Sequence, residues 1–189
     1  MSKKLFTRPF FCFSITFLVI FLDQLSKTII HHSLFLGQSI PVLGEFFKIT
    51  YILNPGGAFG TKLGGNNLYT ILSLIAIILT FIFFFQTKKE QALVRTGLAL
   101  ILGGAVGNLI DRFRFGQVVD FLDFDFFNIS IPEFKLGFIN FLGFHLDRWP
   151  VFNIADSSVT CGAILIILQM FLTKKKPPET AVENVQPQI

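Results

Sequence analysis

The stretch Thr96-Gly-Leu-Ala-Leu-Ile-Leu-Gly-Gly-Ala-Val-Gly-Asn-Leu109 decides the fold that this sequence predicts. It is shorter and richer in glycine than the other apolar runs of the chain. Glycines let helices approach closely inside a membrane bundle, so we predict a span here, over residues 96–112. With this span the chain crosses a membrane four times. Without it, the charge pattern of the remaining loops would be inconsistent.

Three further apolar runs cover residues 10–30, 68–85 and 154–172. Each is close to the length of about 20 residues that a helix needs to cross a bilayer. Hydrophobic residues make up 52% of the 189 residues and charged residues only 15%, whereas soluble domains carry about 25% charged residues. The sequence therefore predicts an all-α membrane protein with four transmembrane helices.

Basic residues form three clusters, and these clusters predict the orientation. They lie before the first span, between the second and third spans, and after the fourth: Lys3, Lys4, Arg8; Lys88, Lys89, Arg95; Lys174, Lys175, Lys176. Basic residues favour the cytoplasmic side, so both termini are predicted to be cytoplasmic. Segments 32–67 and 113–152 then lie outside. The clusters account for most of the net charge of +4, and no nucleic-acid partner is expected.

We predict one domain, residues 1–173, followed by a disordered cytoplasmic tail, residues 174–189, which is polar and contains proline. The basic N-terminus and first apolar run are not interpreted as a cleaved signal peptide. The run is long, contains Asp23 and Lys27, and is not followed by a site of small residues for cleavage.

The two outer segments differ in pattern. Residues 46–52 are aromatic and β-branched and precede the turn sequence Asn54-Pro-Gly-Gly57, which predicts a small sheet on the outer membrane surface. Residues 121–144 alternate aromatic with charged residues and are too interrupted for a span. They are equally compatible with a flap on the headgroups and with a poorly ordered loop.

Asp120 and Asp156 are the strongest candidates for chemistry. Ionisable groups at membrane depth are costly and are functional candidates by default. Two carboxylates that converge can share a proton and activate a water molecule. Asn153 and Asp156 also fit a helix cap with an acid in the first turn, a structural role that is compatible with catalysis.

Other polar residues lie near the predicted outer ends of the spans. Asp23 and Lys27 share a helix face and form either a structural ion pair or a contact to substrate. Asn108 and Arg112 share a face of the third span, and Arg112 suits a phosphate or a carboxylate. Asp111 is best explained as a structural group that closes the helix end.

Other kinds of catalytic site are not indicated. There is no Gly-x-Ser-x-Gly elbow and no His-Glu-x-x-His motif, and Cys12 and Cys161 have no metal-ligand spacing around them. We expect neither a metal nor another cofactor. A proton-coupled transporter and a structural four-helix scaffold remain alternatives. A transporter relay should spread its polar groups through the membrane depth, whereas here they cluster at one side.

Five motifs in order resemble the lipoprotein signal peptidase family, also called signal peptidase II. They are Asp23-Gln-Leu-Ser-Lys27, Asn54-Pro-Gly-Gly-Ala-Phe59, Gly103-Gly-Ala-Val-Gly-Asn-Leu-Ile-Asp-Arg112, Gly116-Gln-Val-Val-Asp-Phe121 and Phe152-Asn-Ile-Ala-Asp156. With the four spans, the resemblance covers roughly residues 10–173. One such motif alone would be weak evidence, but five in this order are highly specific.

The resemblance implies a multi-pass aspartyl endopeptidase of the bacterial cytoplasmic (inner) membrane. It would cut signal peptides from diacylglyceryl-modified prolipoproteins just before the lipidated cysteine, near the extracytoplasmic face. The implied fold adds a small extracytoplasmic β-cradle and a periplasmic loop or short helix. No cofactor is implied, membrane lipids are expected as partners, and we expect a monomer.

The resemblance also assigns residues. The implied catalytic pair is Asp120 and Asp156. The supporting and substrate-binding residues are Asp23, Lys27, Asn54, Gly56, Asn108, Arg112 and Asn153, and Asp111 is structural. The segment between the two aspartates is longer than is usual for the family, with residues 125–146 as the extra piece. We expect this piece to extend a flap over the site.

Overall fold

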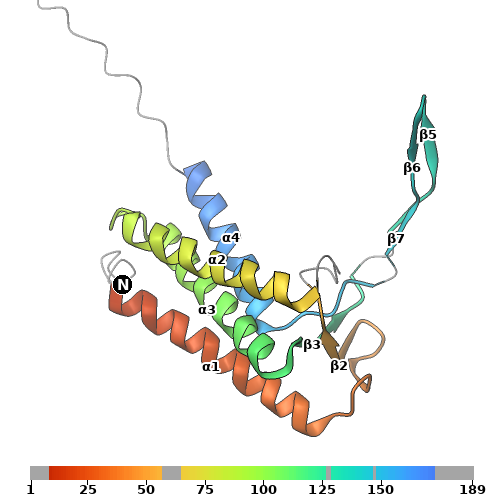
Figure 1. Cartoon of the computed structure of the whole chain (residues 1–189), viewed down its shortest axis with the longest axis horizontal. Helices are drawn as coiled ribbons and strands as arrows, with labels where there is room; N and C mark the ends of the chain where they lie inside the picture. Colours follow the sequence, from red (N-terminus) through yellow and green to blue (C-terminus); the bar gives the residue numbers. More distant parts are fainter. Residues whose placement is uncertain (1–8, 57–64, 127–128, 147, 173–189) are drawn as a thin grey trace, which may run out of the picture.

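Four long helices dominate the computed structural model, which describes residues 9–56, 65–126, 129–146 and 148–172 (Figure 1). They are α1 (Pro9–Ser33), α2 (Gly65–Gln86), α3 (Ala92–Phe115) and α4 (Ile154–Leu172). All four are long and apolar enough to cross a membrane, which confirms the predicted spans. The tail after residue 173, the first and third basic clusters, and residues 57–59 of the Asn54 motif lie outside the described residues.

The third helix begins four residues before the predicted span, because Arg95 is buried rather than solvated. Its guanidinium lies 4.4 Å from the centroid of the Phe84 ring, and Nη1 donates to the Thr87 carbonyl at 3.3 Å. Both partners come from the end of α2 or just after it. A cation held in this way is compatible with a helix interior, so hydropathy alone placed the start of α3 too late.

The glycines of α3 allow close contact with its neighbours, as predicted. A Cβ atom on Gly103 would lie 2.8 Å from Cβ of Val19 in α1. On Gly104 it would collide with the backbone carbonyl of Ala155 in α4. Because α1, α2 and α4 all pack against α3, this helix is the centre of the bundle and brings the other three together.

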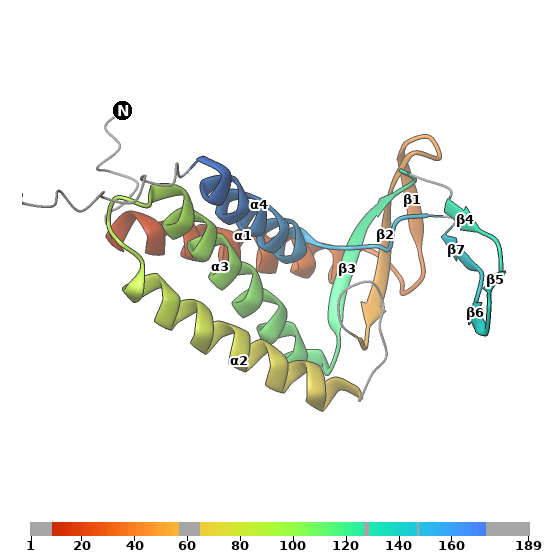
Figure 2. The same cartoon turned by 90° about the horizontal axis from the view of Figure 1, so that it is seen from above.

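A three-stranded antiparallel sheet lies at one end of the bundle (Figure 2). Its strands are β1 (Ser39–Leu43), β2 (Phe47–Asn54) and β3 (Val118–Phe124), in the order β1-β2-β3. Strand β2 confirms the predicted strand and ends at Asn54. The register pairs Asn54 with Val118 and Ile52 with Asp120. A buried cluster of Leu34, Tyr51, Val119 and Phe121 packs the sheet against the end of α1.

Gly116 turns the chain from α3 into β3. It has a positive φ of 69°, and its N–H donates to the Arg112 carbonyl at 3.0 Å. Glycine is favoured at this helix-ending position because it adopts the left-handed conformation without steric cost. The turn places the last residues of α3 beside the first residues of β3.

The segment between β3 and α4 is built mainly from short strands: β4 (Ile129–Ile131), β5 (Phe134–Leu136), β6 (Ile139–Phe141) and β7 (Phe144–Leu146). Strand β4 pairs with β7 and β5 with β6. We call residues 129–146 the arm. It projects away from the bundle in Figure 1 and does not cover the helix ends, so the predicted flap over the site is not seen. No short helix occurs in the described part of this segment; alternating residues favour strands instead.

Candidate active site

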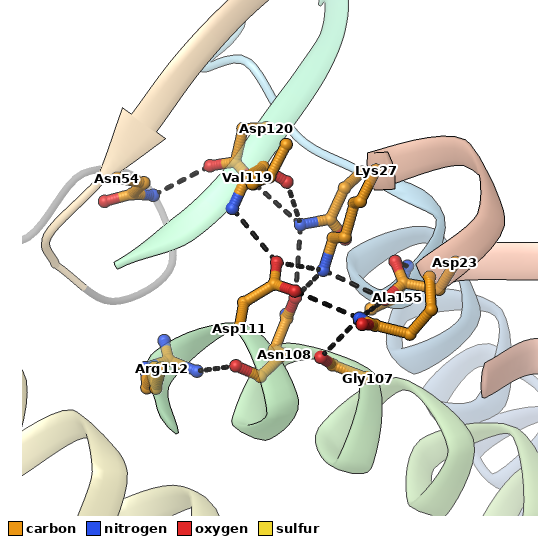
Figure 3. A network of polar contacts seen from close by, with 12 residues as sticks. Asp23, Lys27, Asn54, Gly107, Asn108, Asp111, Arg112, Val119, Asp120 and Ala155 are labelled. Atoms are coloured by element: carbon orange, nitrogen blue, oxygen red, sulfur yellow. Dashed lines mark hydrogen bonds and ion pairs between the residues drawn. The ribbon is translucent and has the colours of Figure 1, made fainter. Parts of the chain in front are cut away.

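The polar residues singled out in the sequence gather where α1, α3 and α4 meet β2 and β3 (Figure 3). Their positions in the fold are Asp23 and Lys27 on α1, Asn54 on β2, Asn108, Asp111 and Arg112 on α3, Asp120 on β3, Asn153 just before α4, and Asp156 on α4. They form one network at one end of the helices. This arrangement does not match a relay spread through the membrane depth.

Asp120 is almost completely enclosed, with 1% of its surface exposed. Its Oδ1 accepts a 2.6 Å hydrogen bond from Asn153 Nδ2, and its Oδ2 accepts a 3.0 Å bond from Asn54 Nδ2. Burial, reinforced by the nearby charge of Asp156, raises the pKa of Asp120 from its ordinary value of 3.8 to about 7. This carboxyl can therefore hold a proton near neutral pH.

Asp156 lies in the first turn of α4 and is half-buried. Its Oδ1 accepts a 2.8 Å bond from Asn108 Nδ2, and its Oδ2 accepts a 3.3 Å bond from the Asn153 N–H. In return, Asn153 Oδ1 accepts the Asp156 N–H at 2.9 Å. This reciprocal pair caps the helix, so the predicted cap is confirmed.

Two asparagine amides connect the two carboxylates. Asn153 Nδ2 contacts both Asp120 Oδ1 and, at 3.1 Å, Asn108 Oδ1. Asn108 Nδ2 in turn donates to Asp156. The carboxylates come from a strand and a helix that are far apart in the sequence, and these amides hold them in one hydrogen-bonded unit.

Lys27 contacts the hydrogen-bonded unit of the two carboxylates through Asn108, and its side chain is 2% exposed. Its ammonium group lies 2.9 Å from Asp23 Oδ2, 2.9 Å from Asp111 Oδ2 and 2.8 Å from Asn108 Oδ1. An ammonium group has three hydrogens to donate, and each finds an acceptor here. The predicted pair of Asp23 and Lys27 is thus part of a buried cluster that includes Asp111.

The same cluster holds the backbone next to each candidate acid. Asp23 Oδ1 accepts the N–H of Ala155 at 2.9 Å, one residue before Asp156. Asp111 Oδ2 accepts the N–H of Val119 at 3.1 Å, one residue before Asp120. Through Lys27, α1 and α3 therefore fix the backbone positions from which both carboxylates project.

Gln24 belongs to this network, although the sequence reasoning did not single it out. Its Nε2 lies 3.0 Å from Asp111 Oδ1, 3.2 Å from Asp23 Oδ2 and 3.1 Å from the Gly107 carbonyl. Its place beside Asp23, as a polar side chain within an apolar run, is the signal that would have identified it.

Arg112 lies beside the pair, and its hydrogen bonds to the described residues are all long. Nη1 is 3.3 Å from Ser73 Oγ and 3.4 Å from the Asn108 carbonyl, and Nη2 is 3.4 Å from the Gly56 carbonyl. Bonds of this length are weak, so the guanidinium is free to adjust toward a ligand. The Gly56 N–H donates to Asn54 Oδ1 at 2.9 Å, which stabilises the turn at residues 54–56.

Among residues 9–56, 65–126, 129–146 and 148–172, no group of three or more His, Cys, Asp or Glu side chains is placed to hold a metal ion. The expectation that the chain needs no cofactor stays a prediction.

Known proteins resemble this chain over most of its length. The family model described as signal peptidase (SPase) II matches residues 15–172. A lipoprotein signal peptidase of Halothermothrix orenii is 37% identical over 161 residues, covering 85% of this chain and 95% of its own. One from Desulforapulum autotrophicum is 39% identical over 163 residues, covering 83% of this chain and 89% of its own.

A solved structure agrees with the sequence comparisons. A bacterial membrane enzyme determined by the in meso method at 2.3 Å resolution superposes with a TM-score of 0.71 and 32% identity, covering 88% of this chain and 93% of its own. The fold, the length of the match and the sequence identities agree, and this chain belongs to the signal peptidase II family.

Proposed function

We propose that Asp120 and Asp156 are the catalytic pair of this aspartic-type signal peptidase, which removes signal peptides from prolipoproteins. The main observation in support is that the two carboxylates belong to one hydrogen-bonded network. Two carboxylates from separate elements are linked through Asn153 and Asn108, and the charge of Asp156 helps to raise the pKa of Asp120. Such a pair retains one proton near neutral pH, and one acid and one base are then available together.

Asp156 is the better candidate for the charged member. It lies at the N-terminus of α4, where the helix dipole favours negative charge. Two N–H donors, from Asn108 and from the Asn153 backbone, also stabilise its charged form. Asp120 is the more deeply buried of the two and is the better candidate for the protonated member.

The reaction follows from these assignments. Asp156 takes a proton from a water molecule while the water oxygen attacks the scissile carbonyl carbon. Asp120 donates its proton to the carbonyl oxygen, which gives a neutral tetrahedral intermediate. When the intermediate collapses, Asp156 returns the proton to the departing amide nitrogen and the hydroxyl proton returns to Asp120. The C–N bond breaks, and the products are the free signal peptide and the lipoprotein with its new amino terminus.

Asn54 and Arg112 are the proposed contacts to the substrate backbone. Asn54 comes from β2 and donates a hydrogen bond to Asp120, and Arg112 comes from the end of α3 (Figure 3). Both can donate hydrogen bonds to peptide carbonyls. The long existing contacts of Arg112 support this role, because a substrate can replace them at little cost.

The orientation is also proposed. The connection between α2 and α3, the start of α1 and the end of α4 lie at the end of the bundle opposite the sheet (Figure 2). Lys88 and Lys89 lie in that connection, and in the sequence the first and third basic clusters precede α1 and follow α4. We therefore place this end and both termini in the cytoplasm. The sheet and the acid pair then lie near the extracytoplasmic face of the inner membrane.

The substrate would be a diacylglyceryl-modified prolipoprotein, cut before its lipidated cysteine, with its acyl chains in the surrounding lipid. We retain the single domain over residues 1–173 and the monomer. One chain supplies both carboxylates and their supporting residues, which supports a monomer as the active form.

A comparison of two precursors tests this function. The chain, reconstituted in lipid nanodiscs, should cleave a diacylglyceryl-modified prolipoprotein and leave the unmodified precursor largely intact. Mass spectrometry of the product should place the lipidated cysteine at the new amino terminus. Equal cleavage of both precursors would show that the diacylglyceryl group is not required for cleavage. Cleavage of neither precursor would contradict the proposed peptidase activity.

The pH dependence of cleavage is a separate expectation. As pH rises through about 7, Asp120 loses its proton and the pair loses its acid. We therefore expect kcat/KM to fall above pH 7, approaching about tenfold per pH unit, with the apparent pKa belonging to the pair. Initial rates from pH 5 to 9 measure this, and return to pH 6 should restore activity. A flat profile up to pH 9 would show that the pair does not share a proton.

A further inference from the structure

We propose that the β5–β6 ribbon at the end of the arm is a lipid-binding surface that lies in the leaflet next to the sheet. The ribbon comprises Phe134–Leu136, Ile139–Phe141 and the residues between and just beyond them. It is separate from the acid pair and does not depend on the assignment of Asp120 and Asp156.

The register makes the ribbon amphipathic. Phe134 pairs with Phe141, and Lys135 pairs with Asn140. Side chains alternate between the two faces of a strand. One face therefore presents Phe134, Leu136 and Phe141, with the two phenylalanine rings stacked at 4.5 Å, and the opposite face presents Lys135 and Asn140.

The apolar face is uncovered. Phe134, Leu136 and Phe141 are all exposed, and the neighbouring Phe138 and Leu142 are 97% and 88% exposed. No other described helix or strand lies against β5 or β6 in Figure 1 or Figure 2. An isolated two-stranded ribbon is marginally stable in water, so this face requires an apolar phase to cover it.

A bilayer is the apolar phase that the structure itself implies. Four membrane-spanning helices end at the sheet from which the arm projects. Their own exposed leucine, isoleucine and phenylalanine side chains form the surface that contacts lipid. The ribbon has the composition of an interfacial element, with aromatic and aliphatic residues on one face and a lysine on the other that can reach phosphate groups.

Just beyond the arm, Arg148 bonds to the sheet and to the turn before it. Arg148, close after β7, donates from Nε to Asp123 Oδ1 at 2.9 Å and from Nη1 to the Glu45 carbonyl at 3.0 Å. Asp123 lies on β3, three residues after Asp120. Lipid contact at the ribbon would therefore restrain β3, the strand that carries one of the two acids, relative to the membrane surface.

Tryptophan fluorescence in nanodiscs tests the proposal without reference to activity. Trp149 is the only tryptophan in the chain, so Trp149→Phe supplies a silent background. A reporter on the apolar face, Leu136→Trp, is compared with a reporter on the polar face, Asn140→Trp. Both replaced side chains are exposed, so neither change should disturb the fold.

With lipids brominated along their acyl chains, we expect the reporter at position 136 to lose about half of its emission and to emit at shorter wavelength. The reporter at position 140 should keep its emission and be quenched by aqueous iodide. If both reporters are quenched by iodide and neither by brominated lipid, the ribbon is in water and the proposal is wrong. Equal lipid quenching at both positions would also overturn it, because the ribbon would then not be oriented by its two faces.

Discussion

Replacing Asp120 by asparagine is expected to abolish cleavage without destabilising the protein. Asparagine has the same shape but cannot supply the proton, and loss of one acid–base group costs between about 10² and 10⁴-fold in rate. The pKa of Asp120 is raised from 3.8 to about 7, so its charge is unfavourable in the fold. The resulting loss of stability grows as pH rises from about 4 to about 7 and is fully present at pH 8. Asp120→Asn removes that charge, and its melting temperature at pH 8 should equal or exceed that of the parent.

The matched control is Asp123→Asn on the same strand. Asp123 is also buried, but it bonds to Arg148 and Thr50 rather than to the acid pair. This variant should lose stability and keep its activity. The measurements are kcat/KM on lipidated prolipoprotein and the melting temperature of each variant in detergent.

Asp156→Asn should be as inactive as Asp120→Asn. Activity above a tenth of the parent level in either variant would show that the replaced acid is structural.

Replacing Lys27 by methionine is expected to have the largest effect on stability. Methionine retains the apolar stem but leaves Asp23 and Asp111 buried without their cation. Breaking a buried ion pair by removing one partner costs about 3–5 kcal/mol. For a chain of this size, that corresponds to a fall in melting temperature of roughly 6–20 °C. The fall should be smaller when Asp23→Asn is added, because one of the two uncompensated charges is then removed.

Labelling of a buried thiol measures this unfolding. Cys12 is fully buried and Cys161 is exposed, so a Cys161→Ser background leaves Cys12 as the reporter of opening on heating. Lys48→Met is the matched control, because this lysine also pairs with a carboxylate but is 22% exposed beside an exposed Glu45. Exposed pairs contribute about 1 kcal/mol or less. If Lys27→Met melts no lower than Lys48→Met, the buried cluster does not support the fold.

Local patterns in the sequence were sufficient for the elements of the bundle. The spans follow from runs of apolar residues, and the fourth span has the bounds that were predicted, Ile154–Leu172. Strand β2 follows from its aromatic and β-branched residues. The start of α3 was misplaced because hydropathy treats Arg95 as solvated, whereas tertiary packing places it over Phe84. The strands of the arm were not predicted, because their short runs are compatible with both a loop and a sheet.

Except for Gln24, the sequence by itself determined which side chains form the polar network, since costly groups stand out against an apolar background. It did not reveal how they are connected. Asp23 accepts a hydrogen bond from Ala155, which lies 132 positions away, and Gln24 reaches Asp111 across 87 positions. Contacts at such separations depend on how closely α1 and α4 pack against the glycines of α3. Only the tertiary structure therefore decided that one buried lysine holds the backbone beside both acids, and that the arm extends away from them.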